Sequence, residues 1–494
     1  MRRIIILWIA LPLLSIMLIL TSGRWYLTQS PEDVTLVNGV HLKWSPCWFN
    51  VPWNKIIHCG HLSPSLQNTN SSISLPVVVF KNISLSFNSD PVLFINGGPG
   101  DANVLNHDGI RDWSDYIDGL NWARDFIVMD HRGTGLSQPK PECKALYDYY
   151  EKSLVTKVGF KQEVRRDYVN FERCLKQVNE QHDLANYSTF HSTQDIRDLM
   201  NTMDYSSWNL FGVSYGTRVA LELMRAQPDN VRSVILDSVY PTDKHSLLKW
   251  PSLQDNAVEM VFERCKKTKA CDEEYPELRK LLTEALLELK DKPRKVNVYN
   301  YYNDRYYDAY INDQRFLTAI YISMYNEQLL PHIPAAIYGA AYEDSALMEP
   351  IISAFADYML DKDFNDVVFF SVECNDSKRI SEPQYQKEIS KYPYLKKYHR
   401  YDWQYNTCRN WTSDAEKILP VAHVKSNIPT LVLSGEYDPV TPWQWGKEVH
   451  NYLLNSYYFK YADMGHSVLT ANNCAVKNSR DFLNNPNEQP VSCN

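Results

Sequence analysis

The stretch that most constrains the fold of this chain is a mostly apolar run that ends in a Gly-x-Ser-x-Gly pattern. Residues 208–211 precede Gly212–Gly216, and residues 217–226 then have the composition of a helix. A strand that turns sharply into a helix needs glycines on both sides of Ser214, because neighbours without side chains let strand and helix approach closely. The N-terminus of that helix would point free N–H groups at an anion formed beside the serine. The pattern predicts a nucleophile elbow, although Gly/Ser loops also produce it by chance.

Short apolar runs and helical patterns alternate along much of the chain. Four runs have the composition of buried parallel strands: 91–95, 125–130, 231–237 and 428–435. Apolar residues at helical spacing cover 192–203, and a helix and a strand follow again over 443–454 and 457–461. Residues 34–44 and 77–87 are strand-rich and could form an antiparallel hairpin that opens the sheet. This rhythm predicts an α/β fold with a mostly parallel, doubly wound sheet.

The alternation stops between about 241 and 424, where the chain is richer in tyrosine, lysine and acidic residues. The patterns in this stretch are mainly helical, as at 277–290 and 333–360. We expect a mainly helical cap, inserted before the strand at 428–435 and covering one end of the sheet. The predicted organisation is an export segment over 1–23, a core formed by 34–240 and 425–494, and a cap over 241–424.

The composition excludes one class of partner and leaves others open. The formal net charge is -8, which argues against nucleic acid as the main partner because phosphate binding needs a basic face. The chain has 33 Tyr and 13 Trp, which suit a wide pocket for carbohydrate or peptide but also fill protein cores. The oligomeric state cannot be predicted from these numbers.

The N-terminus has the features of an export signal. Met1–Arg3 is basic, Ile4–Leu20 is apolar apart from Ser15, and Thr21–Gly23 is small. These are the three regions of a secretory signal peptide, and the apolar run is also long enough to border on a membrane span. We therefore expect an exported protein, periplasmic or secreted, with the segment either cleaved or kept as a membrane anchor.

Ten cysteines agree with export. An even number in an exported chain favours disulfides over metal ligation, and the sequence contains neither Cys-x-x-Cys nor His-Glu-x-x-His, so a metal site has little support. Pairing of sequential neighbours is our hypothesis, although the sequence alone does not prove the connectivity. The five pairs would be Cys47–Cys59, Cys143–Cys174, Cys265–Cys271, Cys374–Cys408 and Cys474–Cys493.

Candidate catalytic residues follow three predicted strands in a characteristic order. An acyl-transfer serine needs a base to take its proton and a carboxylate to orient that base. Ser214, Asp438 and His466 stand in the order that α/β hydrolases use, and His466 alone among thirteen histidines combines a preceding strand, a glycine hinge and this order. Asp237 also ends a strand and stays as an alternative acid, although no special turn follows it.

The same edge of the sheet offers donors for an oxyanion hole. The backbone N–H of Tyr215 is one donor by the geometry of an elbow. The second is expected from Gly97-Gly98, in a glycine-rich loop directly after the strand at 91–95, where the backbone can approach a substrate oxygen. The alternative reading of Gly97–Gly100 is a tight turn.

Taken together, these motifs resemble one family. The motifs are Gly97–Gly100, Asp130–Ser137, Gly212–Thr217, Gly435–Pro442 and Gly465-His466, with the terminal Cys474 and Cys493. They resemble the secreted α/β-hydrolase peptidases of the tripeptidyl-aminopeptidase-like and prolyl-aminopeptidase-like (prolyl iminopeptidase) type, over about 34–493. Two departures are Asn96, where the family often has histidine, and Ser467, where glycine is common. Both departures leave the substrate preference open.

The resemblance implies an α/β-hydrolase fold and an exopeptidase that binds a free peptide N-terminus under its cap. It implies Ser214 as nucleophile, Asp438 as orienting acid and His466 as general base, with no metal or organic cofactor. An α-ammonium group needs a carboxylate, and the cap offers Glu373 and Asp376 on either side of Cys374. The family often has an acid after this cysteine, which favours Asp376, although Glu373 is chemically equal and both could be solvated loop acids.

The leading hypothesis is an exported serine aminopeptidase that acts on peptides through an acyl-enzyme and releases N-terminal residues, of proline type or as tripeptides. A carboxylesterase or lipase could use the same triad, because the sheet edge does not distinguish an amide from an ester. A binding protein without activity on the same fold is a third reading, and the intact triad argues against it.

Overall fold

The computed structural model describes the following stretches of the chain: 30–65, 72–84, 88–226, 228–377, 380–399, 403–411 and 419–493. The predicted export segment over 1–23 lies outside these residues. Within the described stretches, no helix combines the length and the apolar character that crossing a membrane requires.

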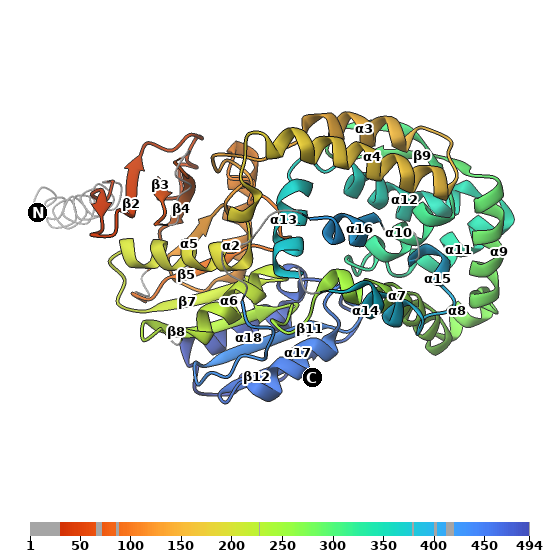
Figure 1. Ribbon diagram of the computed structural model, residues 1–494. Coiled ribbons are helices and arrows are strands. Elements are labelled where there is room, and N and C mark those ends of the chain that lie inside the picture. Colours follow the sequence, from red (N-terminus) through yellow and green to blue (C-terminus); the bar gives the residue numbers. More distant parts are fainter. Residues whose placement is uncertain are drawn as a thin grey trace, which may run out of the picture.

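A ten-stranded sheet forms the core, in the order β1-β2-β3-β4-β6-β5-β7-β8-β11-β12 (Figure 1). Its strands are β1 (Val34–Thr35), β2 (His41–Ser45), β3 (Ile57–Ser63), β4 (Leu75–Phe80), β5 (Val92–Ile95), β6 (Phe126–Met129), β7 (Trp208–Val213), β8 (Val231–Asp237), β11 (Thr430–Gly435) and β12 (Ser456–Tyr461). Pairing is antiparallel from β1 to β4 and between β4 and β6, and parallel from β6 to β12. The opening part is therefore four antiparallel strands and not the predicted single hairpin.

Helices cover both faces of this sheet, as predicted for a doubly wound fold. On one face lie α5 (Thr189–Thr202), α6 (Tyr215–Arg225) and α17 (Trp443–Tyr452), and on the other lie α2 (His107–Leu120) and α18 (Asn473–Asn484). Successive strand residues point to opposite faces, so Val77 and Val79 of β4 pack with the first set, whereas Val78 and Phe80 pack with the second. The central strands are buried on both sides, which explains their continuous apolar sequences.

A layer of helices lies beyond one end of the sheet (Figure 1). It contains α7 (Ser246–Lys267), α8 (Lys269–Glu274), α9 (Leu278–Asp291), α10 (Asp313–Ser323), α11 (His332–Tyr342), α12 (Ser345–Met359), α13 (Asp366–Ser377), α14 (Glu382–Ile389), α15 (Lys396–His399), α16 (Trp403–Arg409) and the hairpin β9 (Arg294–Asn300) with β10 (Arg305–Ile311). Two helices that precede the elbow, α3 (Lys144–Leu154) and α4 (Phe160–Asn179), pack in the same layer. The division of the chain at 241 and 424 stays a prediction, to which the structure adds α3 and α4.

One buried arginine joins these two parts of the helical layer. The guanidinium of Arg315 in α10 is bonded to the carboxylate of Glu163 in α4, and it donates to the carbonyl oxygens of Ser153 (2.7 Å) and Leu154 (3.1 Å) at the end of α3. The side chains of Arg315 and Glu163 are only 2% and 9% exposed. Because a charge buried this deeply needs a partner, the contact ties α3 and α4 to the cap.

The structure joins the ten cysteines in the five sequential pairs, with Cα–Cα distances from 4.7 to 5.9 Å. These distances lie in the usual range for disulfides. Cys143–Cys174 connects the start of α3 to α4, and Cys374–Cys408 connects α13 to α16. Both bridges therefore lie within the helical layer.

We expect Arg315→Met to lower the free energy of unfolding by about 3–5 kcal/mol, because Glu163 is left as a buried charge without its partner. Urea unfolding followed by tryptophan fluorescence measures this loss. The double variant Glu163→Gln/Arg315→Met should recover part of it. Arg305→Met, which removes a largely exposed pair with Glu151, is the matched control and should cost less than about 1 kcal/mol. If both variants lost the same free energy of unfolding, Arg315 would not be the buried contact that stabilises the helical layer.

Candidate active site

Ser214 stands on a strained corner between β7 and α6. Its φ of 54° and ψ of -121° lie outside the regions that residues with side chains usually adopt. A Cβ on Gly212 would lie 2.6 Å from the carbonyl oxygen of Gly216, and a Cβ on Gly216 would lie 1.9 Å from that of Ile95. Both glycines are therefore required for the close contact of strand and helix, as the elbow pattern predicts.

Asp438 and His466 meet at the neighbouring strand ends. Asp438 is fully buried after β11, and its Oδ1 accepts hydrogen bonds from the backbone N–H groups of Val440 (3.0 Å) and Thr441 (2.9 Å). Its Oδ2 accepts from the Thr441 hydroxyl (2.6 Å) and lies 2.9 Å from Nδ1 of His466. A proton on Nδ1 donates to this carboxylate, which leaves Nε2 of His466 as the acceptor that a general base requires.

The surroundings of His466 set its pKa. Burial disfavours the imidazolium, but the charge and hydrogen bond of Asp438, together with the charges of Asp237 and Asp101, outweigh burial and raise the pKa of His466 above its ordinary value of 6.5. The backbone N–H of His466 donates to the carbonyl of Tyr325 (3.1 Å), and the two rings lie 5.0 Å apart. The imidazole is thus held from the cap side as well as from the core.

Asp237, the alternative acid, has a different position. Its fully buried carboxylate accepts from the backbone N–H groups of Val468 and Leu469, both at 3.0 Å, two and three residues after His466. Burial raises the pKa of Asp237 to about 6 although these bonds oppose the shift. No hydrogen bond joins it to the imidazole, although both residues are described. Asp237 therefore holds the loop that carries His466, and Asp438 holds the ring.

Ser214 and His466 line the same cavity of about 540 Å³ between the ends of the strands and the helical layer. The structure shows no hydrogen bond between the Ser214 hydroxyl and His466, two residues that are both described. Such bonds are often long in free enzymes and shorten when the substrate binds. Asn96, Gly97 and Gly98 lie in the wall of this cavity, so the glycine-rich loop after β5 and Ser214 border the same space.

The two glycines of this loop are not equivalent. The N–H of Gly97 donates to the side-chain oxygen of its neighbour Asn96 (2.8 Å), so it is already in use. Among the described residues, neither Gly98 N–H nor Tyr215 N–H has a hydrogen-bond acceptor. Gly98 has a φ of +100°, and a Cβ there would lie 2.5 Å from Gly100 N. Of the predicted oxyanion donors, Gly98 and Tyr215 are available, whereas Gly97 is not.

The structure also separates the two acids of the cap. Glu373 lines the cavity, where its Oε2 accepts from the Ser246 hydroxyl (2.6 Å). Asp376 does not line the cavity. Its carboxylate accepts from the hydroxyl (2.5 Å) and the backbone N–H (3.3 Å) of Thr189 and lies 3.7 Å from Nε of Arg218. The sequence favoured Asp376 as the partner of an ammonium group, but in the structure its carboxylate is already paired at the start of α5.

The cavity carries more acidic groups than basic ones. Six carboxyl residues line it: Asp101, Glu163, Asp167, Asp361, Asp366 and Glu373. As far as the described residues show, Arg315 is the one lysine or arginine in this wall, and it is bonded to Glu163. Burial raises the pKa of four of these groups to about 7: Asp101, Asp167, Asp366 and Glu373. An acidic cavity suits cationic ligands.

Sequence reasoning missed most of these acids. Asp101 follows the glycine-rich loop directly, and a carboxylate at that point of a sheet edge is a signal that could have identified it. Four acids within residues 357–366 are a second such signal. No sequence signal points to Glu163 or Asp167, because their helix precedes the elbow and was not predicted to belong to the cap.

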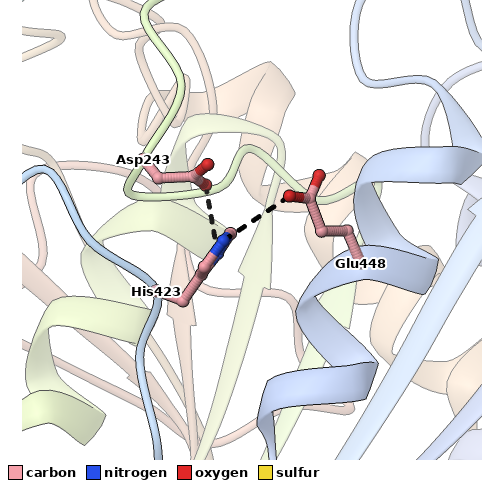
Figure 2. Close-up of side chains that lie close together, drawn as sticks. All are labelled: Asp243, His423 and Glu448. Carbon is pink, nitrogen blue, oxygen red and sulfur yellow. Dashed lines mark ion pairs between the residues drawn. The ribbon is translucent and has the colours of Figure 1, made fainter.

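Asp243, His423 and Glu448 form a separate cluster outside the cavity (Figure 2). Nδ1 of His423 lies 3.4 Å from Asp243, and its Nε2 lies 3.5 Å from Glu448. The spacing would suit a metal ion, but the ammonium group of Lys244 lies 2.8 Å from Asp243 and 3.0 Å from Glu448. Because a cation is already present between the two carboxylates, the cluster is an ion-pair network that joins α17 to both ends of the predicted cap.

The structure has the α/β-hydrolase fold. A family model described as alpha/beta hydrolase fold matches residues 90–329, and one described as TAP-like protein matches residues 394–493. These matches confirm the fold and the resemblance that the motifs predicted.

Similar proteins include two peptidases and a solved hydrolase. The serine protease Hip1 of Mycobacterium tuberculosis is 21% identical over 495 residues, which cover 92% of this chain and 90% of that protein. The tripeptidyl aminopeptidase of Streptomyces lividans is 22% identical over 461 residues, which cover 87% and 81%. The solved structure of MGS-M2, an α/β hydrolase from a Medee basin deep-sea metagenome library, is 15% identical, with 83% of this chain and 94% of that chain covered and a TM-score of 0.36.

The rate at which a fluorophosphonate labels Ser214 tests which acid orients the base. We expect Asp438→Asn to lower this rate by about 10³–10⁴, because the Nδ1 proton loses its acceptor. Asp237→Asn should reduce it far less, since the Asp237 carboxylate bonds to the backbone of the loop after His466 and not to the imidazole. Ser214→Ala gives the background. An equal or larger loss for Asp237→Asn would reverse the assignment.

The labelling rate should also depend on pH. Only neutral His466 can take a proton, and its pKa is raised, so the rate should fall about tenfold per pH unit once the pH drops below that pKa. The apparent pKa should lie above 6.5 and should decrease in Asp438→Asn, which removes the stabilising charge. A rate profile from pH 5 to 9 without an acid limb, or with one well below 6.5, would contradict this description.

Proposed function

We propose that this protein is an exported serine aminopeptidase that binds the free N-terminus of a peptide and cleaves near it through an acyl-enzyme. The observation that carries the proposal is a buried carboxyl group, Glu373, on the wall of the cavity that also contains Ser214 and His466. The names of the relatives, a serine protease and a tripeptidyl aminopeptidase, agree with a peptide substrate.

The chemistry follows from the positions of the groups. The Ser214 hydroxyl attacks the scissile carbonyl carbon while Nε2 of His466 takes its proton, and the N–H groups of Gly98 and Tyr215 stabilise the oxyanion. The C–N bond then breaks, and His466 gives the proton to the leaving amine. A water molecule attacks the acyl group in the same way, and Ser214 is released with its proton. Asp438 stabilises the imidazolium in both halves.

Glu373 would bind the α-ammonium group. Burial raises the pKa of Glu373 to about 7, against the Ser246 hydrogen bond and the charge of Arg218. An ammonium group placed beside it would draw the proton off, because an opposite charge favours the ionised carboxylate. The cavity volume lies in the range of small-ligand sites, so it suits a short peptide segment with its N-terminus inside the cap.

Export is part of the proposal. The apolar segment near the N-terminus has the sequence of a signal, and five disulfides are typical of proteins that fold in an oxidising compartment. Edman sequencing identifies the first residue of the mature protein, and mass spectrometry gives the mass of the whole chain. Either result tells whether the segment is removed or kept as a membrane anchor.

A panel of substrates tests the activity. We expect cleavage of mono-, di- and tripeptide aminomethylcoumarin amides with a free N-terminus, and little cleavage of the same peptides after acetylation. The length that is cleaved best tells whether one residue or three are released. Efficient cleavage of the acetylated peptides would contradict the proposal. Hydrolysis of p-nitrophenyl esters alone would support an esterase instead.

Glu373→Gln tests the anchor. We expect KM for free-N-terminus substrates to rise about 10–100-fold with a smaller change in kcat, because a hydrogen bond to a charged group contributes about 1.5–3 kcal/mol. Asp376→Asn is the control on the same helix, and it should leave KM near the wild-type value because Asp376 does not line the cavity. If Asp376→Asn raised KM and Glu373→Gln did not, the anchor would be assigned to the wrong acid.

A further inference from the structure

Asp101 is fixed in place beside the catalytic serine by its backbone. Its carbonyl oxygen accepts from the side-chain amide of Asn96 (3.2 Å), and it forms an isolated antiparallel bridge with Phe364. On either side of it, Ala102 N–H donates to the carbonyl of Asp363 and Asn365 N–H donates to that of Gly100, both at 3.0 Å. The loop after β5 is thereby joined to the linker between α12 and α13.

The carboxyl group of Asp101 lies close to Ser214, and no hydrogen bond or ion pair joins it to another described residue. It lines the cavity with Ser214 and His466. A Cβ on Gly97 would lie 3.2 Å from the Ser214 Cβ and 3.7 Å from Oδ2 of Asp101, which places this oxygen near the nucleophile. Glu373, in contrast, accepts hydrogen bonds from Ser246 and Tyr240.

The charged groups around Asp101 are mostly carboxylates, and none of those that the structure describes is a permanent cation. Burial raises the pKa of Asp101 to about 7, the carboxylates of Asp361 and Asp363 act in the same direction, and His466 opposes them. His466 is neutral when it acts as the base, so it gives no lasting positive charge. A cation bound here would stabilise the ionised carboxylate, since an unpaired charge away from water is costly.

Aromatic rings complete the surroundings. Tyr325, whose ring contacts His466, and Tyr358, which is 51% exposed, both line the cavity, and Asp101 acts electrostatically on both. The face of a tyrosine ring attracts ammonium and guanidinium groups. Carboxylates combined with tyrosine rings therefore favour a basic side chain over an apolar one of equal length.

We propose that Asp101 is a specificity-determining residue that selects substrates with lysine or arginine next to the scissile bond. This inference rests on the proposed peptidase activity, and it concerns a second positive charge, separate from the N-terminal ammonium group at Glu373. The basic side chain pairs with Asp101, with Asp361 and Tyr358 beside it. Ser214, His466 and Asp438 perform the same steps on every substrate. The selectivity therefore comes from the ion pair between the basic side chain of the substrate and Asp101.

The test compares two substrates on one enzyme. Two series of peptides with a free N-terminus are compared. In one series the residue before the scissile bond is lysine or its uncharged analogue norleucine, and in the other series the residue after the bond is varied in the same way. The value of kcat/KM is measured for each peptide. We expect a lysine-to-norleucine ratio of at least about ten on one side, equal to about 1.4 kcal/mol, and a ratio near one in Asp101→Asn. A general loss of activity or of folded protein cancels in this ratio.

Two controls separate selection from other roles. Asp101→Glu keeps the charge and should keep part of the preference. Asp363→Asn, on the linker that pairs with Asp101 but outside the cavity wall, should keep most of it. The wild-type ratio should fall as the pH drops below about 7, where Asp101 takes up its proton. A ratio near one in the wild type, or a ratio that survives in Asp101→Asn, overturns the proposal. A pH profile that shifts equally for both substrates would instead make Asp101 a group that tunes His466.

A binding measurement keeps this inference separate from the peptidase activity. Butylguanidine should protect Ser214 from fluorophosphonate labelling at a concentration at least about tenfold lower than neutral butylurea, and Asp101→Asn should remove the difference. If no peptide is cleaved but this difference is found, the proposed function fails and the cation subsite stands. Equal protection by the two compounds overturns the subsite itself.

Discussion

The active site depends on the close contact among β5, β7 and α6. Ile95 pairs with Gly212 in the sheet, and the carbonyl of Ile95 lies where a side chain on Gly216 would begin. This contact forces Ser214 out of the ordinary backbone regions and brings the start of α6 against the loop that follows β5. The proposed nucleophile and the two proposed oxyanion donors are thus positioned by one backbone contact, and the rest of the site is added around it.

Much of the core could be predicted from the sequence, because its chemistry lies where parallel strands end. Ser214, Asp438 and His466 follow separate strands, and the carboxyl ends of parallel strands meet at one edge of a sheet. Apolar runs identify such strands without any knowledge of their partners. β3 was missed because its histidines, cysteine and glycine break the apolar pattern, and its place in the sheet comes from pairing with β2 and β4.

The remaining features depend on contacts between distant side chains, which no local pattern records. Gly97 and Gly98 are equal in the sequence, and only the hydrogen bond from Gly97 to Asn96 distinguishes them. Glu373 and Asp376 differ because Asp376 reaches Thr189, which is almost two hundred positions away in the chain. In the same way, α3 and α4 belong to the helical layer because of a buried arginine on α10.

The backbone bonds between the loop after β5 and the linker of α12 and α13 connect the chemistry to its selectivity. Gly100 and Ala102 belong to the loop that carries Gly98, the proposed oxyanion donor, and Asp363 and Asn365 belong to the linker between α12 and α13. The cap therefore does more than cover the sheet, since its linker holds this loop while bringing carboxylates beside it. Sequence changes in the linker can alter the charge near the scissile bond without touching Ser214, Asp438 or His466. If the proposed peptidase activity holds, the same Ser214, Asp438 and His466 can serve different peptides through changes in this linker.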